Sequence, residues 1–138
     1  MRFSKTSEYA LRAMIYLAQN KGEVISVMKL HKALEIPYKY LARIMSALAE
    51  GGIVQSEPGK YGGFKLATDI KKISMADIIK ITEEFEGYRE CLLGLGKCVK
   101  KQPCQLHNVW VEHRERLIKL LNNTNLDDLL QPEPARIK

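Results

Sequence analysis

The chain has 138 residues, of which 46% are hydrophobic and 28% are charged, values that are ordinary for a soluble globular protein. This length suits one domain, or a small domain with an extension. The apolar run AMIYLA (Ala13 to Ala18) is too short to span a bilayer, and the charges around it exclude a signal-peptide core. We therefore expect a cytoplasmic protein with reduced thiols and no membrane partner.

The net charge of +6 is unevenly distributed along the chain. Residues 1–72 hold 12 Lys and Arg against 6 Asp and Glu, whereas residues 73–138 hold 10 of each kind. The whole positive excess therefore lies in the N-terminal half, which is typical of a module that binds a polyanion. Charge alone does not distinguish this interpretation from a solvated basic surface.

The first elements in chain order are two helices. Residues 4–20 carry apolar side chains at helical spacing. Ser26 is then expected to cap a short helix over residues 27–34, in which His31 would lie exposed.

A third helix and a hairpin follow. Pro37 suits the first turn of a helix, and two glycines after Glu50 end it. Its apolar stripe consists of Leu41, Ile44, Met45 and Leu48. The runs IVQS and FKL, joined by EPGKYGG, predict a β-hairpin. Two short helices, a tight break, a third helix and a hairpin together predict a winged helix-turn-helix, whose third helix enters the DNA major groove.

The C-terminal half is expected to contain three further helices. Ser74 with Asp77 predicts a capping box at the start of the first one. A long helix is expected from Cys104, and Thr124 is expected to cap a last turn. Five residues of the long helix follow the 4, 3, 4, 3 spacing of a coiled-coil seam, which predicts pairing with a second copy of the chain: Leu106, Trp110, His113, Leu117 and Leu120.

The expected fold class is mainly α with a small β wing, in which a long C-terminal dimerisation helix follows the winged helix-turn-helix domain. The expected divisions are a DNA-binding domain over 1–68, a linker helix over 69–87, a cysteine loop over 88–103, a dimerisation helix with a short terminal helix over 104–130, and a tail over 131–138.

The candidate DNA-binding residues are basic, hydroxyl-bearing or aromatic side chains on the first three helices and the wing. Lysine and arginine bind phosphates or guanine edges, and tyrosine packs against sugars or thymine methyl groups. The candidates are Arg2, Lys5, Lys29, Tyr38, Lys39, Tyr40, Arg43, Ser46, Lys60 and Tyr61.

All three cysteines lie in one segment, with the spacing Cys91-x6-Cys98-x5-Cys104-x2-His107. These gaps are too wide for a compact zinc knuckle but suit a loop around a larger inorganic core. Inert or disulfide-forming thiols remain the alternative. An enzyme that uses Cys104 and His107 is not expected, because no orienting residue, oxyanion motif or phosphate loop accompanies them.

The segments MRFSKTSEYALRAMIYLA, PYKYLARIMSAL, GGIVQSEPGKYGGFKLA and CLLGLGKCVKKQPCQLHNVW together resemble the Rrf family of bacterial regulators. That family includes the iron–sulfur cluster assembly regulator and the nitric-oxide-sensing repressor. The resemblance covers roughly residues 1 to 130. It implies a homodimeric winged-helix transcription factor, for which a pseudo-palindromic site on double-stranded DNA is expected.

The resemblance also implies a cofactor. In cluster-binding members, cysteines that match Cys91, Cys98 and Cys104 hold an iron–sulfur cluster, of which the 2Fe–2S form is favoured here and the 4Fe–4S form is the alternative. The fourth ligand is a histidine matching His107 in some members, and in others an acidic residue matching Glu8, donated by the second subunit. The competing interpretations are a regulator that senses through thiols or zinc, and one with no cofactor.

Overall fold

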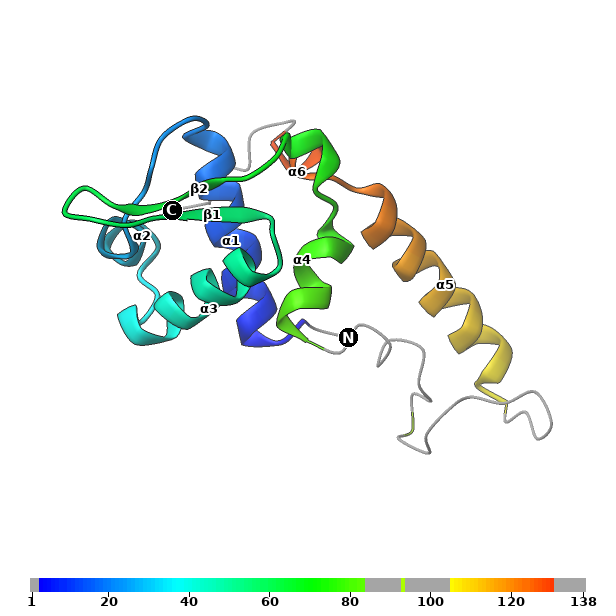
Figure 1. Cartoon of the computed structure of the whole chain (residues 1–138). Coiled ribbons are helices and arrows are strands. Elements are labelled where there is room, and N and C mark those ends of the chain that lie inside the picture. The colour runs from blue at the N-terminus through cyan, green and yellow to red at the C-terminus, as the bar shows by residue number, and fades with distance from the viewer. Residues whose placement is uncertain (1–2, 84–92, 94–104, 131–138) are drawn as a thin grey trace.

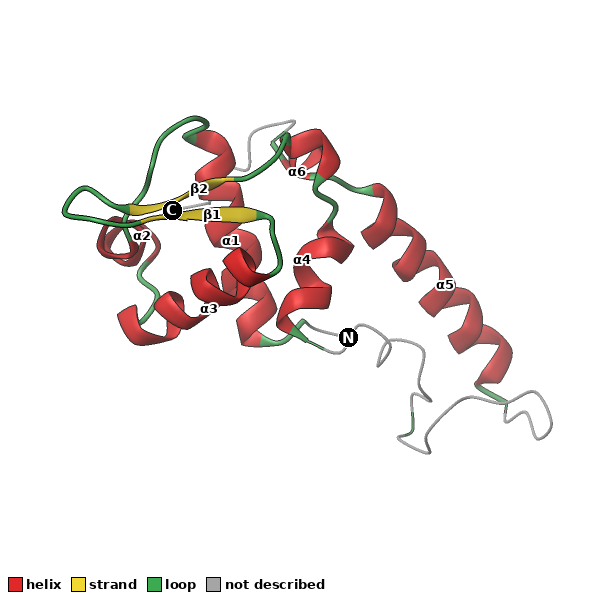
Figure 2. Cartoon of the chain, viewed as in Figure 1, coloured by secondary structure: helices red, strands yellow, loops and turns green. Residues whose placement is uncertain are grey.

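The structure, a computed structural model, describes residues 3–83, 93 and 105–130. Figures 1 and 2 show a mostly helical chain with one two-stranded antiparallel sheet. The elements in chain order are α1 (Lys5–Gln19), α2 (Val27–Leu34), α3 (Tyr38–Glu50), β1 (Val54–Glu57), β2 (Gly63–Leu66), the 3-10 turn η1 (Ile70–Lys72), α4 (Met75–Thr82), α5 (His107–Asn123) and α6 (Leu126–Leu129). The expected fold class, mainly helical with a small wing, is confirmed.

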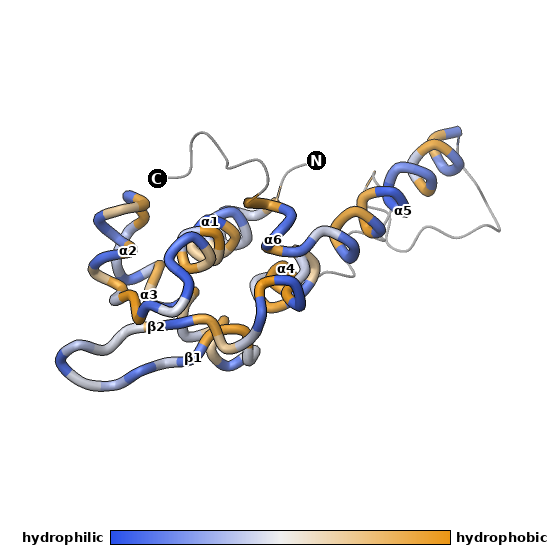
Figure 3. The backbone as a smooth tube through the Cα atoms, turned by 90° about the horizontal axis from the view of Figure 1, so that it is seen from above, coloured by the Kyte–Doolittle hydropathy of each residue, from blue (hydrophilic) through white to orange (hydrophobic). Residues whose placement is uncertain are grey.

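Helix α1 packs against α2, α3, β2, α4 and α6, and the core lies between these elements (Figure 1). We call the elements from α1 to α4, together with α6, the body. The hydropathy colouring of Figure 3 shows apolar positions recurring along these helices. On α3 the stripe predicted from the sequence is buried, with exposures of 0–3%: Leu41, Ile44, Met45 and Leu48. This burial leaves the opposite face of α3 for solvent or a ligand.

A tight turn joins α2 to α3. Ser26 caps α2 as predicted, because its hydroxyl accepts a hydrogen bond from the Lys29 backbone N–H at 3.1 Å. Glu35 adopts a left-handed conformation with φ 57° and ends the helix. Pro37 is the N-cap of α3, which begins at Tyr38. The sequence predicted it one position later, within the first turn.

His31 corrects the sequence-based expectation of an exposed helix residue. Its ring is half-buried, and Nδ1 lies 2.6 Å from the carbonyl oxygen of Ile36. The turn after α2 brings that carbonyl, five residues further along the chain, back to the last turn of the helix, which helical periodicity alone does not predict. His31 therefore contributes to the geometry of the helix-turn-helix.

The wing is the antiparallel pair β1–β2, in which Val54 faces Leu66 and Glu57 faces Gly63. Strand β2 is tied to the segment before α2, close to its own first residue, by two hydrogen bonds of 2.8 Å between the backbones of Ile25 and Phe64. Gly63 permits this approach, because a Cβ atom at that position would lie 2.3 Å from the Ile25 carbonyl oxygen.

The junction between α4 and α6 contains one confirmed cap and one correction. Ser74 and Asp77 form the predicted capping box at α4. The last helix, however, is capped by Asn125 with Asp128, one residue later than the Thr124 that the sequence indicated. Thr124 instead ends α5, and its carbonyl oxygen accepts a hydrogen bond from the Met75 N–H at 2.8 Å.

Helix α5 extends away from the body (Figures 1 and 3). The C-terminal part of α5 contacts the body through α4. Ile118 and Leu121 are the residues buried in that contact. The helix begins at His107, and the expected start at Cys104 lies outside the described residues. The division of the chain into domains at the expected boundaries stays a prediction. In the part of the chain that is described, no helix has both the length and the apolarity needed to cross a membrane.

Candidate nucleic-acid interface and sensor segment

The outward face of α3 holds four of the ten candidate DNA-binding residues. Tyr38, Lys39, Arg43 and Ser46 are exposed, and Tyr38 retains 44% of its surface. They lie opposite the buried stripe because residues three or four positions apart share a helix face. The structure therefore presents two cations, a hydroxyl and an aromatic ring on one side of the second helix of the helix-turn-helix.

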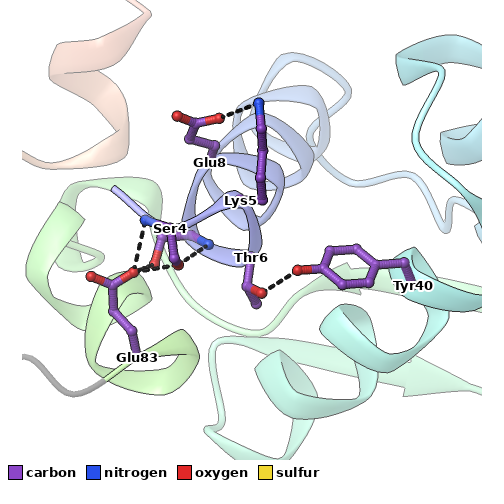
Figure 4. A network of polar contacts seen from close by, with 7 residues as sticks. Ser4, Lys5, Thr6, Glu8, Tyr40 and Glu83 are labelled. Carbon is purple, nitrogen blue, oxygen red and sulfur yellow. Dashed lines mark hydrogen bonds and ion pairs between the residues drawn. The ribbon is translucent and has the colours of Figure 1, made fainter. Parts of the chain in front are cut away.

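Tyr40 lies differently from these neighbours. Its ring is half-buried and meets the Tyr9 ring edge-to-face, with centroids 5.5 Å apart. Its hydroxyl forms a hydrogen bond with Thr6 Oγ1 in the first turn of α1 (Figure 4). Tyr40 thus joins the start of α3 to the start of α1, and its hydroxyl is already engaged within the body.

The wing tip carries the second group of candidates. Lys60 Nζ lies 5.6 Å from the centre of the Tyr61 ring, and Tyr61 retains 87% of its surface. An ion pair of 2.9 Å between Lys65 and Glu57 joins the two strands behind the tip. The wing therefore presents one cation and one aromatic ring at its end.

The remaining candidates lie near the starts of α1 and α2. Lys29 is exposed on α2 and borders an open hollow of about 520 Å³, which Lys32 and Tyr16 also line. Lys5 is exposed, and its Nζ lies 3.2 Å from the Glu8 carboxylate. Arg2 lies outside the described residues.

The candidate ligands of the sensor are only partly described. Cys91, Cys98 and Cys104 lie outside the described residues. His107 is the first residue of α5 and is 7% exposed, and Glu8 is a half-buried residue in the first turn of α1. Among the described residues, no three His, Cys, Asp or Glu side chains gather as a metal site. The ligand set therefore stays a prediction.

Glu83 is a functional candidate that the sequence did not indicate. The residue follows α4, and its carboxylate oxygen Oε2 accepts hydrogen bonds from Ser4 and Ser7 in the first turn of α1 (Figure 4). The partners are 79 and 76 positions away in sequence, so no local pattern could reveal the contact. Only the packing of α4 beside α1 brings these residues together.

Comparison with known proteins agrees with this geometry. The model of the Rrf2 family, described as an iron-dependent transcriptional regulator, matches residues 3–132. A protein of Aquifex aeolicus (strain VF5) named as an HTH-type transcriptional regulator is 36% identical, over 99% of this chain and 96% of the relative. The HTH-type transcriptional regulator IscR of Klebsiella pneumoniae (strain 342) is 30% identical, over 94% of this chain and 80% of the relative.

A solved structure shows the same architecture. CymR (YrzC), the global cysteine regulator of B. subtilis, superimposes with a TM-score of 0.82 and 25% identity, over 97% of this chain and 99% of CymR. These relatives are named as regulators rather than enzymes, as the sequence led us to expect. With the family model matching nearly the whole chain, the protein belongs to the Rrf2 family of DNA-binding transcriptional regulators.

Proposed function

We propose that the chain is a cytoplasmic, homodimeric regulator that binds a pseudo-palindromic site on double-stranded DNA and changes its DNA affinity with the state of its cysteine segment. The observation that carries the DNA part is the two-faced helix α3. One face is buried at 0–3%, and the other presents Lys39, Arg43 and Ser46 to solvent. That arrangement is the one a recognition helix needs, because its inner face fixes its position while its outer face contacts bases and phosphates.

The wing supports the same proposal. Lys60 and Tyr61 project at its tip, where a cation and a planar ring suit the phosphate backbone and the neighbouring groove. Arg2, Lys5 and Lys29 would add phosphate contacts, and Tyr38 would pack against a sugar or a thymine methyl group. Phosphate neutralisation should make the affinity fall steeply with salt concentration.

The dimer part of the proposal rests on α5. Leu106, the N-cap of α5, retains 46% of its surface, and Val109 and Leu120 on the helix retain 56% and 58%, although α5 buries other residues against α4. Pairing with the same helix of a second chain would cover them, and the two-fold symmetry of the pair would match a pseudo-palindromic site.

The cofactor part rests on the chemistry of the donor set. Thiolates of Cys91, Cys98 and Cys104 are the ligands that an iron–sulfur cluster prefers, and the imidazole of His107 or the carboxylate of Glu8 in the partner subunit would complete the set. Such a cluster supplies a centre whose charge and integrity change with redox state, iron supply or nitric oxide. His107 is the first residue of α5, and Glu8 lies in the first turn of α1, so either ligand would connect the centre to an element that this proposal assigns to DNA binding or pairing.

The cofactor proposal is tested by anaerobic purification with measurement of iron, sulfide and visible absorption. We expect brown protein with about two or four irons per chain. Cys98→Ala should lose the iron, sulfide and colour while sedimentation still shows the dimer. Colourless wild-type protein without iron or sulfide, even after reconstitution, would contradict the cluster.

The DNA proposal is tested by fluorescence anisotropy on an operator selected from random duplexes with the wild-type protein. Arg43→Ala should weaken binding by about tenfold or more, because an arginine on the recognition helix contacts a base edge or a phosphate. Lys119→Ala removes the same charge from an exposed position on α5 and serves as the matched control. Equal affinities of the Arg43→Ala and Lys119→Ala proteins would show that α3 is not the reading element.

A second candidate is a regulator whose cysteines respond by reversible thiol oxidation. Its support is the structural similarity to CymR of Staphylococcus aureus, of which one solved structure is named as the oxidized form. Under this candidate, diamide would change operator affinity in protein that contains no iron, and dithiothreitol would restore it. Diamide leaving the affinity unchanged would remove this candidate.

A further inference from the structure

The chain leaves α4 in a way that turns one acidic side chain back onto α1. Helix α4 ends at Thr82, and Glu83 adopts an extended conformation with φ −155° and ψ 171°. The Glu83 N–H still bonds to the Ile79 carbonyl at 2.9 Å, so the residue stays tied to the last turn. In sequence, Glu83 stands between α4 and the segment that contains the three cysteines, the first of which is Cys91.

The Glu83 carboxylate gathers the polar groups at the N-terminus of α1. Its Oε2 accepts from the Ser4 backbone N–H at 3.2 Å, from the Ser4 hydroxyl, and from the Ser7 hydroxyl at 2.5 Å (Figure 4). Ser4 is the N-cap of α1, where its Oγ accepts from the Ser7 N–H at 3.1 Å. A carboxylate is favoured there because unpaired N–H groups give a helix start partial positive charge.

The hydroxyl groups of this network have more acceptors within reach than protons to donate. An ionised carboxylate can only accept, so Ser7 must donate its one proton to Glu83. The Thr82 hydroxyl lies 2.6 Å from Ser7 Oγ, and it also lies within donating distance of the backbone carbonyl oxygens of Ile78 and Ile79, at 3.3 and 3.2 Å. Ser7 is 0% exposed, so loss of the Glu83 carboxylate would remove the charged acceptor of a buried hydroxyl and leave only the neutral Thr82 hydroxyl to accept its proton.

The same turn of α1 is bonded to α3 on its other side. The Thr6 hydroxyl forms a hydrogen bond with the Tyr40 hydroxyl. In sequence, Tyr40 stands between Lys39 and Arg43, whose side chains are exposed. A hollow of about 240 Å³ separates the first turn of α1, the outer side of α3 and the last turn of α4, and its lining includes Thr6, Arg43 and Thr82. The first turn of α1 therefore has α4 on one side and α3 on the other, with open space beside the contact.

We propose that Glu83 is a positioning residue that relays the state of the cysteine segment to the recognition helix. The segment sets whether the carboxylate stays on Ser4 and Ser7, and release shifts the first turn of α1 and, through the Thr6–Tyr40 bond, the start of α3. The inference deepens the proposed function and rests on it for the DNA-binding consequence. The contact network itself concerns only described residues, so it can be tested separately.

The test is hydrogen exchange of the amides in the first turn of α1, read by mass spectrometry. Wild-type protein is compared before and after two treatments of its cysteines, namely anaerobic loading with ferrous iron and sulfide, and oxidation with diamide. At least one treatment should change exchange near Ser7 and Glu8 several-fold. Operator affinity is measured on the same samples.

Glu83→Gln is the decisive variant, because it keeps the size of the side chain and weakens its acceptor by removing the charge. Its exchange and its operator affinity should differ less than twofold between treated and untreated protein. Glu112→Gln is the matched control, since Glu112 pairs with Arg116 at 2.6 Å on the exposed surface of α5. The control should respond like wild type. A purely structural role of Glu83 would lower stability but leave the response to treatment intact.

Ser7→Ala provides a second variant that removes a donor instead of the acceptor. If Glu83 and Ser7 act as one unit, the double variant should lose no more of the response than either single variant. A Glu83→Gln protein that keeps the wild-type response, or wild-type exchange in α1 that neither treatment changes, would overturn the inference. Failure of wild-type protein to bind any selected duplex would instead contradict the proposed function, and the exchange data would still decide the role of Glu83.

Discussion

The body and α5 differ in how completely they bury their large apolar side chains. In the body, large side chains such as Met14, Leu30 and Met45 are 0% exposed and belong to one core. On α5, only Ile118 and Leu121 among the large apolar side chains are buried, whereas Leu106 and Leu120 keep about half of their surface, at 46% and 58%. One chain thus contains a unit with a closed apolar core and a helix of which several apolar side chains stay exposed.

This difference distinguishes the apolar burial that one chain achieves alone from the burial that requires a second chain. Burial of a leucine contributes about 1.5–3 kcal/mol, so the body gains its stability within one chain. The exposed positions of α5 gain nothing until another surface covers them. Under the proposed function that surface is the second α5, and pairing also sets the distance between the two recognition helices.

The largest expected effect breaks the body. Leu48→Ala should lower the free energy of unfolding by about 3 kcal/mol, because it leaves a cavity at a fully buried position on α3. Urea unfolding followed by circular dichroism measures the change. Ser46→Ala, two residues away on the exposed face, should shift stability by less than about 0.5 kcal/mol. Similar losses in the two variants would contradict the orientation of α3.

The next effect breaks the pairing of α5. Leu120→Ala should raise the dimer dissociation constant by on the order of a hundredfold, because each of two chains loses a buried side chain at the interface. Sedimentation equilibrium reports the change. Lys119→Ala, at the neighbouring exposed position, should leave the dimer unaffected. A dimer that tolerates Leu120→Ala would place the interface elsewhere.

A smaller effect concerns α4, the element between the two regions. Ser74→Ala should destabilise the protein by about 1 kcal/mol, because the Asp77 N–H loses its bond of 3.0 Å to the Ser74 hydroxyl. Thermal unfolding measures this difference. A melting temperature equal to that of wild type would mean that the capping box contributes nothing to stability.

The smallest effect depends on pH. The backbone N–H of Lys71 donates to Asp69 and lowers the pKa of that carboxyl below its usual 3.8, with help from nearby lysine charges and against a small effect of burial. A lowered folded-state pKa means that the carboxylate stabilises the fold at higher pH, and that this contribution is lost as pH falls through the folded pKa. Asp69→Asn should therefore be less stable than wild type near neutral pH, and the gap should narrow below about pH 3.8. Thermal melts near neutral pH and below about pH 3.8 measure the stability difference between Asp69→Asn and wild type. A difference that is the same at both pH values would contradict this assignment.

Local patterns predicted the parts of the fold that depend on nearby residues. The stripe from Leu41 to Leu48 and the capping box at Ser74 involve spacings of three or four residues, so the sequence contains them directly. The last cap was misplaced because Thr124 and Asn125 both precede an aspartate by three residues. The choice between them depends on Met75, which uses the Thr124 carbonyl from a distant part of the chain.

The site shows the same limit more strongly. The outward cations of α3 follow from helical periodicity, and the structure places Lys39 and Arg43 on the expected face. The engagement of Tyr40 with Thr6, and of Glu83 with Ser7, depends on how whole helices pack. Helical periodicity therefore predicts the outward positions of Lys39 and Arg43, whereas the contacts of Tyr40 and Glu83 depend on tertiary packing.

The most direct test of the account is the operator affinity of one wild-type preparation measured anaerobically in two forms, loaded with iron and sulfide and then stripped. We predict that the two dissociation constants differ by about tenfold or more, a coupling of about 1.4 kcal/mol between the cysteine segment and the recognition helix. Equal dissociation constants in protein that demonstrably holds iron and sulfide would contradict the claim that this segment controls DNA binding.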